Sequence, residues 1–162
     1  IFGKVFIEPK SILPEVGAKI MSLTDPRKKM SKSDDSKSYI SLFDEPSEIQ
    51  KKIMSATTDS GKEIIYNVHK KPGISNLLAI YSLITDQPIS QIQKQFANKS
   101  YLDFKKTLAK ELINFLEPFR RKRKELIARD VYIQEILKRG ASQAQIIAKN
   151  TMQEVKEKMG LF

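Results

Sequence analysis

The chain has 162 residues, of which 29 are lysine or arginine and 19 are aspartate or glutamate, so its net charge is +10. Hydrophobic residues make up 40% and charged residues 30%, proportions that exclude a disordered tail or a fibrous repeat. There is no cysteine and only one histidine, His69, which excludes a disulfide framework, a thiolate metal site and a histidine cluster.

The first 40 residues alternate short apolar runs with turn residues. Residues 4–7 predict a short strand, and residues 18–23 predict a buried strand or the end of one. Residues 26–38 contain one apolar side chain, Met30, and predict an exposed loop. Residues 1–40 are therefore expected to be the end of an α/β unit.

From residue 41 the apolar pattern has helical spacing. Ser47 is expected to cap a helix that places Ile49 and Ile53 on one face. Residues 62–66 fit either a short strand or an extended link. A second helix follows Pro72-Gly73, with Ser75 as its expected cap.

A short helix is expected to start at Pro88, and the longest helical pattern covers residues 102–128. Apolar residues recur there from Phe104 to Phe119 at steps of three or four, which favours a place for Phe119 in the core. The alternative is an aromatic platform on which a nucleic-acid base stacks. Pro118 is expected to kink this helix, because proline lacks a backbone donor and crowds the preceding turn.

The last stretch predicts two helices. One runs over residues 130–139 and stops at Gly140, and the other is capped by Ser142 and ends at Gly160. Residues 41–162 are thus expected to form a mostly α-helical domain.

The segment with the clearest chemistry is the loop Lys29-Met30-Ser31-Lys32-Ser33, hereafter the KMSKS loop. Lysine ammoniums are mobile point charges that suit a polyphosphate, and hydroxyl and loop N–H groups add directed donors. Met30 can anchor the loop against the core or against a purine face. The alternative is a solvated basic loop without a ligand.

The pentapeptide is the signature of the class I aminoacyl-tRNA synthetases. Residues 17–23, Asp25-Pro26 and residues 71–78 closely resemble the tryptophanyl-tRNA synthetases of that family, and the closing Met159-Gly160-Leu161 also fits. The resemblance implies that residues 1–40 are the C-terminal piece of a Rossmann-like nucleotide-binding domain. It also implies that residues 41–162 form a helical, tRNA anticodon-binding domain.

The resemblance carries over to individual positions. It implies that Lys29 and Lys32 are catalytic through contacts with the phosphates of ATP, with Lys32 the better candidate for stabilising the transition state. The backbone at Ile20 would contact the adenosine. The ATP-binding residues implied are Ile20, Lys29, Met30, Ser31, Lys32 and Ser33.

The family's histidine motif, its glycine-rich adenosine loop and its tryptophan pocket all belong upstream of the matched blocks, and His69 does not match that motif. The chain, which starts at Ile1 rather than Met, therefore resembles the C-terminal part of the enzyme. The full-length protein is expected to be a homodimer that activates tryptophan with ATP and magnesium and transfers it to tRNA(Trp). This part alone is not expected to activate tryptophan.

Two charged clusters have open interpretations. Arg120 to Lys124 are five consecutive cations, which form either a tRNA phosphate contact or a charged collar on a helix. Asp34-Asp35 binds magnesium, caps the next segment or offsets the charge of the neighbouring lysines. We assign no residue as a metal ligand.

The sequence contains no run of about 18 apolar residues, so no membrane-spanning helix is expected. It contains no secretory signal, and the lack of cysteine fits a reducing compartment, so a cytoplasmic location is expected. Two other classes of function remain: a non-catalytic RNA-binding module that retains the loop, and a helical protein-interaction domain.

Overall fold

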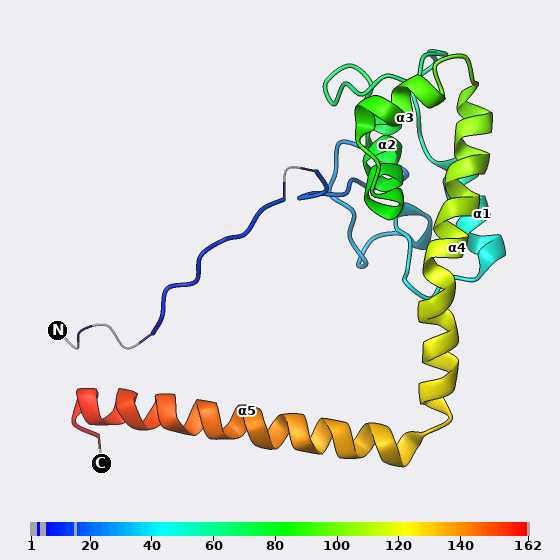
Figure 1. Ribbon diagram of the computed structural model, residues 1–162. Helices are drawn as coiled ribbons and strands as arrows, with labels where there is room; N and C mark the ends of the chain where they lie inside the picture. The colour runs from blue at the N-terminus through cyan, green and yellow to red at the C-terminus, as the bar shows by residue number, and fades with distance from the viewer. Residues whose placement is uncertain (1–2, 4–5, 15, 162) are drawn as a thin grey trace. The chain divides into compact units, whose positions relative to one another are not determined.

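The structure is a computed structural model that describes residues 3, 6–14 and 16–161. The elements in chain order are a short 3-10 helix and five α-helices (Figure 1): η1 (Ser36–Ser38), α1 (Pro46–Ser55), α2 (Pro72–Thr85), α3 (Ile89–Gln95), α4 (Tyr101–Ile127) and α5 (Asp130–Met159). The described residues form no strand, although an isolated antiparallel bridge joins Met21 to Lys29. The mostly helical architecture is confirmed, whereas no sheet represents the expected α/β unit.

The chain divides into two compact units. Leu13–Arg121 forms one and contains α1, α2, α3 and most of α4, and the other contains α5. The first unit extends across residue 40. The expected domains, residues 1–40 and 41–162, therefore do not coincide with the two compact units. They stay a prediction about which parts of the chain carry which function.

The core of the Leu13–Arg121 unit combines one face from each of α1 to α4. An aromatic cluster lies at its centre, where the Phe104 ring of α4 lies 5.0 Å from that of Phe96 and 5.8 Å from that of Tyr81, between centroids. The side chains of Ile20, Met30 and Ile40 pack against this core from the N-terminal part of the unit. The helices therefore provide the platform on which the KMSKS loop rests.

The segment at residues 18–23 differs from its prediction as a strand. Its backbone bonds to a hairpin arm, to the side chain of Asn76 and, at Leu23, to the backbone of Ser38 and Thr57. No ladder of strand residues forms, so the apolar run is buried without a sheet. Of the strand expected at residues 4–7, residues 4 and 5 lie outside the described residues.

The start of α1 is two residues earlier than predicted. Glu45 is the N-cap, Pro46 occupies the first helical turn, and the Glu45 N–H donates to Oε2 of Glu48 at 3.2 Å in a capping box. Proline is pre-organised for this position. Ser47, which we predicted as the cap, therefore lies inside the first turn.

The start of α2 also precedes the predicted cap. The N-cap is Lys71, and Ser75 lies inside the helix, where its Oγ accepts a hydrogen bond from the Asn67 N–H at 2.8 Å. Residues 62–66 are the extended link rather than the strand. Ser75 thus binds the link that precedes α2 in the sequence instead of capping the helix.

A buried lysine joins α4 to the end of α1. The Lys105 Nζ donates to the carbonyls of Ala56 at 2.6 Å and Met54 at 3.4 Å. Desolvation lowers the pKa of this ammonium below its ordinary value. The charge lies where the last carbonyls of a helix lack partners and where the helix dipole favours a cation.

Helix α4 runs through Pro118 without interruption. Arg120 turns inward and is buried. Its Nη2 donates to the Ile113 carbonyl at 2.8 Å, and its guanidinium pairs with Glu117. Phe119 is 44% exposed, so its predicted place in the core is wrong.

Helix α5 is one helix where two were predicted. Gly140 does not have a positive φ, and Ser142 donates through Oγ to the Lys138 carbonyl at 3.0 Å. A single glycine costs a helix only about 1 kcal/mol relative to alanine, so a long helix can pass through it. The predicted end at Gly160 is confirmed, because Gly160 has the left-handed conformation that terminates helices.

A polar cluster of Asp59, Lys71 and Tyr101 connects the segment before α2 to the start of α4. The Tyr101 hydroxyl donates to Asp59 Oδ1 at 3.0 Å and accepts from Lys71 Nζ at 3.1 Å. Desolvation raises the pKa of Asp59, but hydrogen bonds from Gly61, Tyr101 and Lys71 outweigh it and leave that pKa below its ordinary value. The ionised carboxylate is therefore stabilised by folding.

We expect the substitution Tyr101→Phe to lower the free energy of unfolding by about 0.5–1.5 kcal/mol at neutral pH. Because the folded-state pKa of Asp59 is depressed, the stability that this carboxylate contributes is complete above its unfolded pKa and is lost as the pH falls through the folded pKa. Urea unfolding at several pH values should show the two proteins converging in acid. Tyr132→Phe, which alters a half-exposed tyrosine of α5, is the control and should match the parent. A stability difference that stays constant into strong acid would contradict the account.

Candidate functional site

The KMSKS loop leaves from a hairpin that backbone hydrogen bonds close twice. The Ser22 N–H donates to the Lys28 carbonyl at 2.8 Å, and the Met30 N–H donates to the Ile20 carbonyl at 2.9 Å. These two bonds flank the isolated bridge described above. The structure therefore brings Ile20, predicted to contact adenosine, directly beside the start of the loop predicted to bind phosphate.

The turn of this hairpin is organised by Asp25. Its carbonyl accepts from the Lys28 N–H at 2.9 Å, and its Oδ1 accepts from the Arg27 N–H at 3.2 Å. Pro26 follows Asp25, as is common at the second position of such turns. The Asp25 carboxylate also lies 3.8 Å from Lys28 Nζ, an exposed pair that offsets little of the local positive charge.

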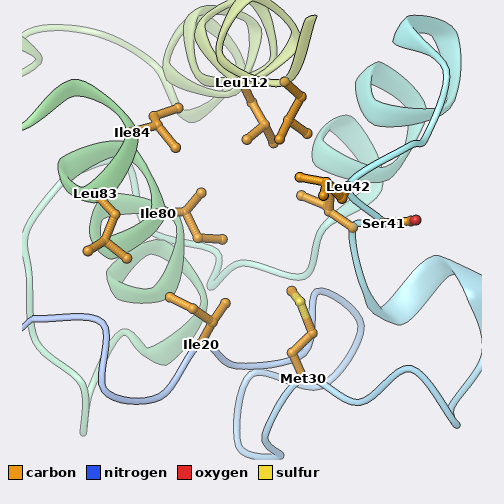
Figure 2. A pocket seen from close by; sticks show the side chains of 10 residues that line it. Ile20, Met30, Ser41, Leu42, Ile80, Leu83, Ile84 and Leu112 are labelled. Carbon is orange, nitrogen blue, oxygen red and sulfur yellow. The ribbon is translucent and has the colours of Figure 1, made fainter. Parts of the chain in front are cut away.

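Met30 anchors the loop on its apolar side. It lines an open apolar pocket of about 280 Å³ together with Ile20 and residues of α2 and α4. Figure 2 shows Ile20 and Met30 across this pocket from Ile80 of α2 and Leu112 of α4. Of the two uses predicted for Met30, its side chain takes the one toward the core.

The two lysines of the loop lie on the solvent side. Lys29 and Lys32 are exposed, and within the described part of the chain neither ammonium makes a hydrogen bond or an ion pair. Between them the Ser31 Oγ accepts from the Ser33 N–H at 3.3 Å, which bends the loop back. The loop therefore presents two cations to an anion while its fold is held by other groups.

The acidic pair after the loop is used locally. Asp35 is the N-cap of η1, and its Oδ1 accepts from the Lys37 N–H at 2.9 Å. Of the interpretations of this pair, capping therefore describes Asp35. The described residues hold no group of three or more aspartate, glutamate or histidine side chains placed to hold a metal ion.

The second basic cluster separates into two kinds of residue. Arg120 is buried in the Leu13–Arg121 unit, whereas the four cations that follow it are exposed. One of the four, Lys122, lies 3.5 Å from a carboxylate oxygen of Glu125. Residues 121–124 are the part of the run that can meet a partner.

Our sequence reasoning did not single out Asn76. This residue is buried in α2, and both polar ends of its carboxamide bond to the backbone of Met21. Asn76 lies within residues 71–78, one of the blocks that carry the family resemblance. The one signal in the sequence is a carboxamide side chain among small or apolar residues of the predicted helix, which indicates a buried polar group that needs a hydrogen-bond partner.

None of the helices in the described ranges combines the length and apolarity needed to cross a bilayer.

His69 is exposed, as expected of a surface loop, and its backbone N–H donates to Oδ1 of Asn67 at 3.1 Å.

Two curated relatives align with almost the whole chain. The tryptophan--tRNA ligases of Caldanaerobacter subterraneus subsp. tengcongensis and Oceanobacillus iheyensis are each 44% identical to it, over 162 and 161 residues. Each alignment covers 99% of this chain and 49% of the relative. The chain thus spans about half the length of these relatives.

Solved structures of the same kind of enzyme are similar. The crystal structure of tryptophanyl-tRNA synthetase from Mycoplasma pneumoniae has a TM-score of 0.77 and 34% identity, covering 92% of this chain and 45% of that one. The Campylobacter jejuni enzyme, complexed with ADP and tryptophane, has a TM-score of 0.67 and 28% identity, covering 99% and 49%.

The family model described as tRNA synthetases class I (W and Y) matches residues 2–117, which is more than half of the chain. This match contains the hairpin, the KMSKS loop and the helices that support them. The chain therefore belongs to the class I tRNA synthetases of the W and Y group.

Proposed function

We propose that the chain is the C-terminal part of a tryptophan--tRNA ligase and supplies the loop that binds ATP and pyrophosphate. The full-length protein would join tryptophan to ATP, release pyrophosphate and transfer the tryptophanyl group to tRNA(Trp). The observation that carries this proposal is the KMSKS loop itself, anchored through Met30 with Lys29 and Lys32 free of partners in the described residues. The similarity to tryptophan--tRNA ligases supports tryptophan as the amino acid.

The proposed chemistry is electrostatic. As tryptophan attacks the α-phosphate, negative charge grows on the departing pyrophosphate, and the two lysines stabilise that charge together with magnesium bound to ATP. The hydroxyls and N–H groups of Ser31 and Ser33 add donors, and the backbone at Ile20 contacts the adenosine. Met30 serves as the anchor of the loop. No side chain of this chain is assigned as a general base.

The remaining parts of the proposal concern the whole protein. Residues 41–162 would bind the anticodon region of tRNA(Trp), with the exposed cations at 121–124 as candidates for phosphate contacts. The tryptophan pocket would lie in the upstream part, the full-length enzyme would be a cytoplasmic homodimer, and residues 1–162 alone would not activate tryptophan.

The test is amino-acid-dependent exchange of pyrophosphate into ATP by the full-length protein. We expect exchange with tryptophan at a rate at least about 10⁴-fold above that with tyrosine, since a site built to bond a substrate's polar group rejects a mismatch strongly. The 162-residue chain alone should show none. Equal exchange with both amino acids, or tRNA binding without any exchange, would contradict the proposal, and the latter would favour a non-catalytic RNA-binding module.

A further inference from the structure

The backbone of Met21 is paired with a side chain in the way that a strand is paired with a neighbouring strand. Its N–H donates to Asn76 Oδ1 at 2.8 Å, and its carbonyl accepts from Asn76 Nδ2 at 2.7 Å. One carboxamide thus satisfies both polar groups of one residue, 55 positions away in sequence. Both bonds are short for their type.

Asn76 is the kind of residue that such pairing requires. It is 5% exposed, in a helix whose first nine residues after Pro72 are buried without interruption. A carboxamide offers an acceptor and donors on one planar group, which neither an ionised carboxylate nor an alkyl chain does. Substitution by either removes the donor to the Met21 carbonyl, which lies in a partly buried position, and a carbonyl that loses its donor away from water costs free energy.

Met21 transmits this attachment to the KMSKS loop. It is the bridge partner of Lys29, and the flanking bonds tie Ile20 to Met30. Fixing Met21 on α2 therefore fixes the register of the adenosine-contacting position and of the first phosphate-binding lysine together.

A second attachment lies one helical turn further along α2. Met30 and Ile20 share the apolar pocket with Ile80, four residues after Asn76. The hairpin is therefore held on one helix at two points, a polar one at Asn76 and an apolar one near Ile80. Figure 2 shows the apolar one. Apolar contact is non-directional, so the polar point is the one that sets the register.

We propose that Asn76 is a positioning residue for ATP: through Met21 it holds Ile20 and Lys29 at a fixed register on α2. This role rests on the proposed function for its link to ATP. The neighbouring Ser75 provides a matched comparison, because it is equally buried but bonds the linker at Asn67 instead.

The experiment compares Asn76→Leu with Ser75→Ala in the full-length protein. We expect Asn76→Leu to raise the KM for ATP at least about tenfold, in line with the loss of the hydrogen bonds to the partly buried Met21 backbone, while the KM for tryptophan changes less than about twofold. Ser75→Ala should leave both KM values near those of the parent. Equal effects of the two variants on the KM for ATP, or no effect of Asn76→Leu, would overturn the inference.

Hydrogen–deuterium exchange provides a readout that does not need catalysis. In Asn76→Leu the peptides containing Met21 and Met30 should exchange faster while the peptide containing Asn67 does not, and Ser75→Ala should give the reverse pattern. If Asn76→Leu does not fold, the isosteric Asn76→Asp takes its place. Unchanged protection at Met21 would overturn the positioning role, whereas a parent protein without tryptophan-dependent exchange would overturn only the proposed function.

Discussion

Replacing Lys32 by alanine is expected to slow tryptophan-dependent ATP–pyrophosphate exchange by the full-length protein about 10²–10³-fold, as the loss of one preorganised charge-stabilising donor does elsewhere. Lys32 is exposed and, among the described residues, has no internal partner. Its removal therefore takes a cation from the ligand without leaving an unpaired group in the protein. The effect should fall on kcat more than on the KM for tryptophan.

Lys37 provides the matched control for this result. It is exposed in η1, five residues after Lys32 in the sequence. If general positive charge attracts ATP, Lys32→Ala and Lys37→Ala will slow exchange alike, and the role given to Lys32 is then wrong. We expect Lys37→Ala to stay within about twofold of the parent, because exposed charges away from the ligand are screened by salt.

Replacing Phe104 by alanine is expected to lower the free energy of unfolding by about 3–5 kcal/mol, the usual range for truncating a buried aromatic side chain. Phe104 has no exposed surface, and its ring contacts those of Phe96 and Tyr81. Its loss would leave a cavity where α2, α3 and α4 meet. Urea unfolding followed by far-UV circular dichroism measures the change.

Phe115 on the same helix is the control for the cavity effect. It is 45% exposed and contacts Phe119, which is exposed to a similar degree. We expect Phe115→Ala to cost less than about 1.5 kcal/mol, since much of the ring already contacts water. A loss in Phe115→Ala as large as that in Phe104→Ala would contradict the assignment of the Phe104 effect to its burial, because alanine is the better helix former at both positions.

The sequence was most informative where one periodic pattern runs for many residues. The spacing of apolar residues predicted α4 over 102–128, within one residue of its observed bounds at each end. The cap of α1 was harder, because Glu45 with Pro46 and Ser47 with Gln50 are both acceptable starts, and local pattern does not choose between them. Gly140 was read as a stop, whereas a long helix passes through it.

Errors arose where burial is decided by distant parts of the chain. Residues 18–23 have the apolar composition of a strand, but that segment bonds to a hairpin arm, to a helix side chain and to the backbone of Ser38 and Thr57. Phe119 continued the apolar stripe of α4, yet it lies near the end of the compact unit, where less of the core remains to cover it. Neither outcome can be read from neighbouring residues.

The candidate site shows the same contrast. The residue types of the KMSKS loop pointed to polyphosphate, and the structure places Met30 inward and Lys29 and Lys32 outward. The support beneath the loop was not predicted. Asn76 is a polar residue in a mostly apolar helix. The sequence pattern does not tell which backbone groups its side chain bonds, and in the structure these are the N–H and carbonyl of Met21.

The inward turn of Arg120 changes how the basic run after Pro118 should be dissected. Its guanidinium bonds the carbonyls of Ile113 and Asp44 and pairs with Glu117, so it holds the end of α4 to the start of α1. A variant that neutralises all five cations would unfold part of the protein while it removes surface charge, and lost RNA binding would then have two causes. Neutralising residues 121–124 while keeping Arg120 separates the electrostatic contribution from the architectural one.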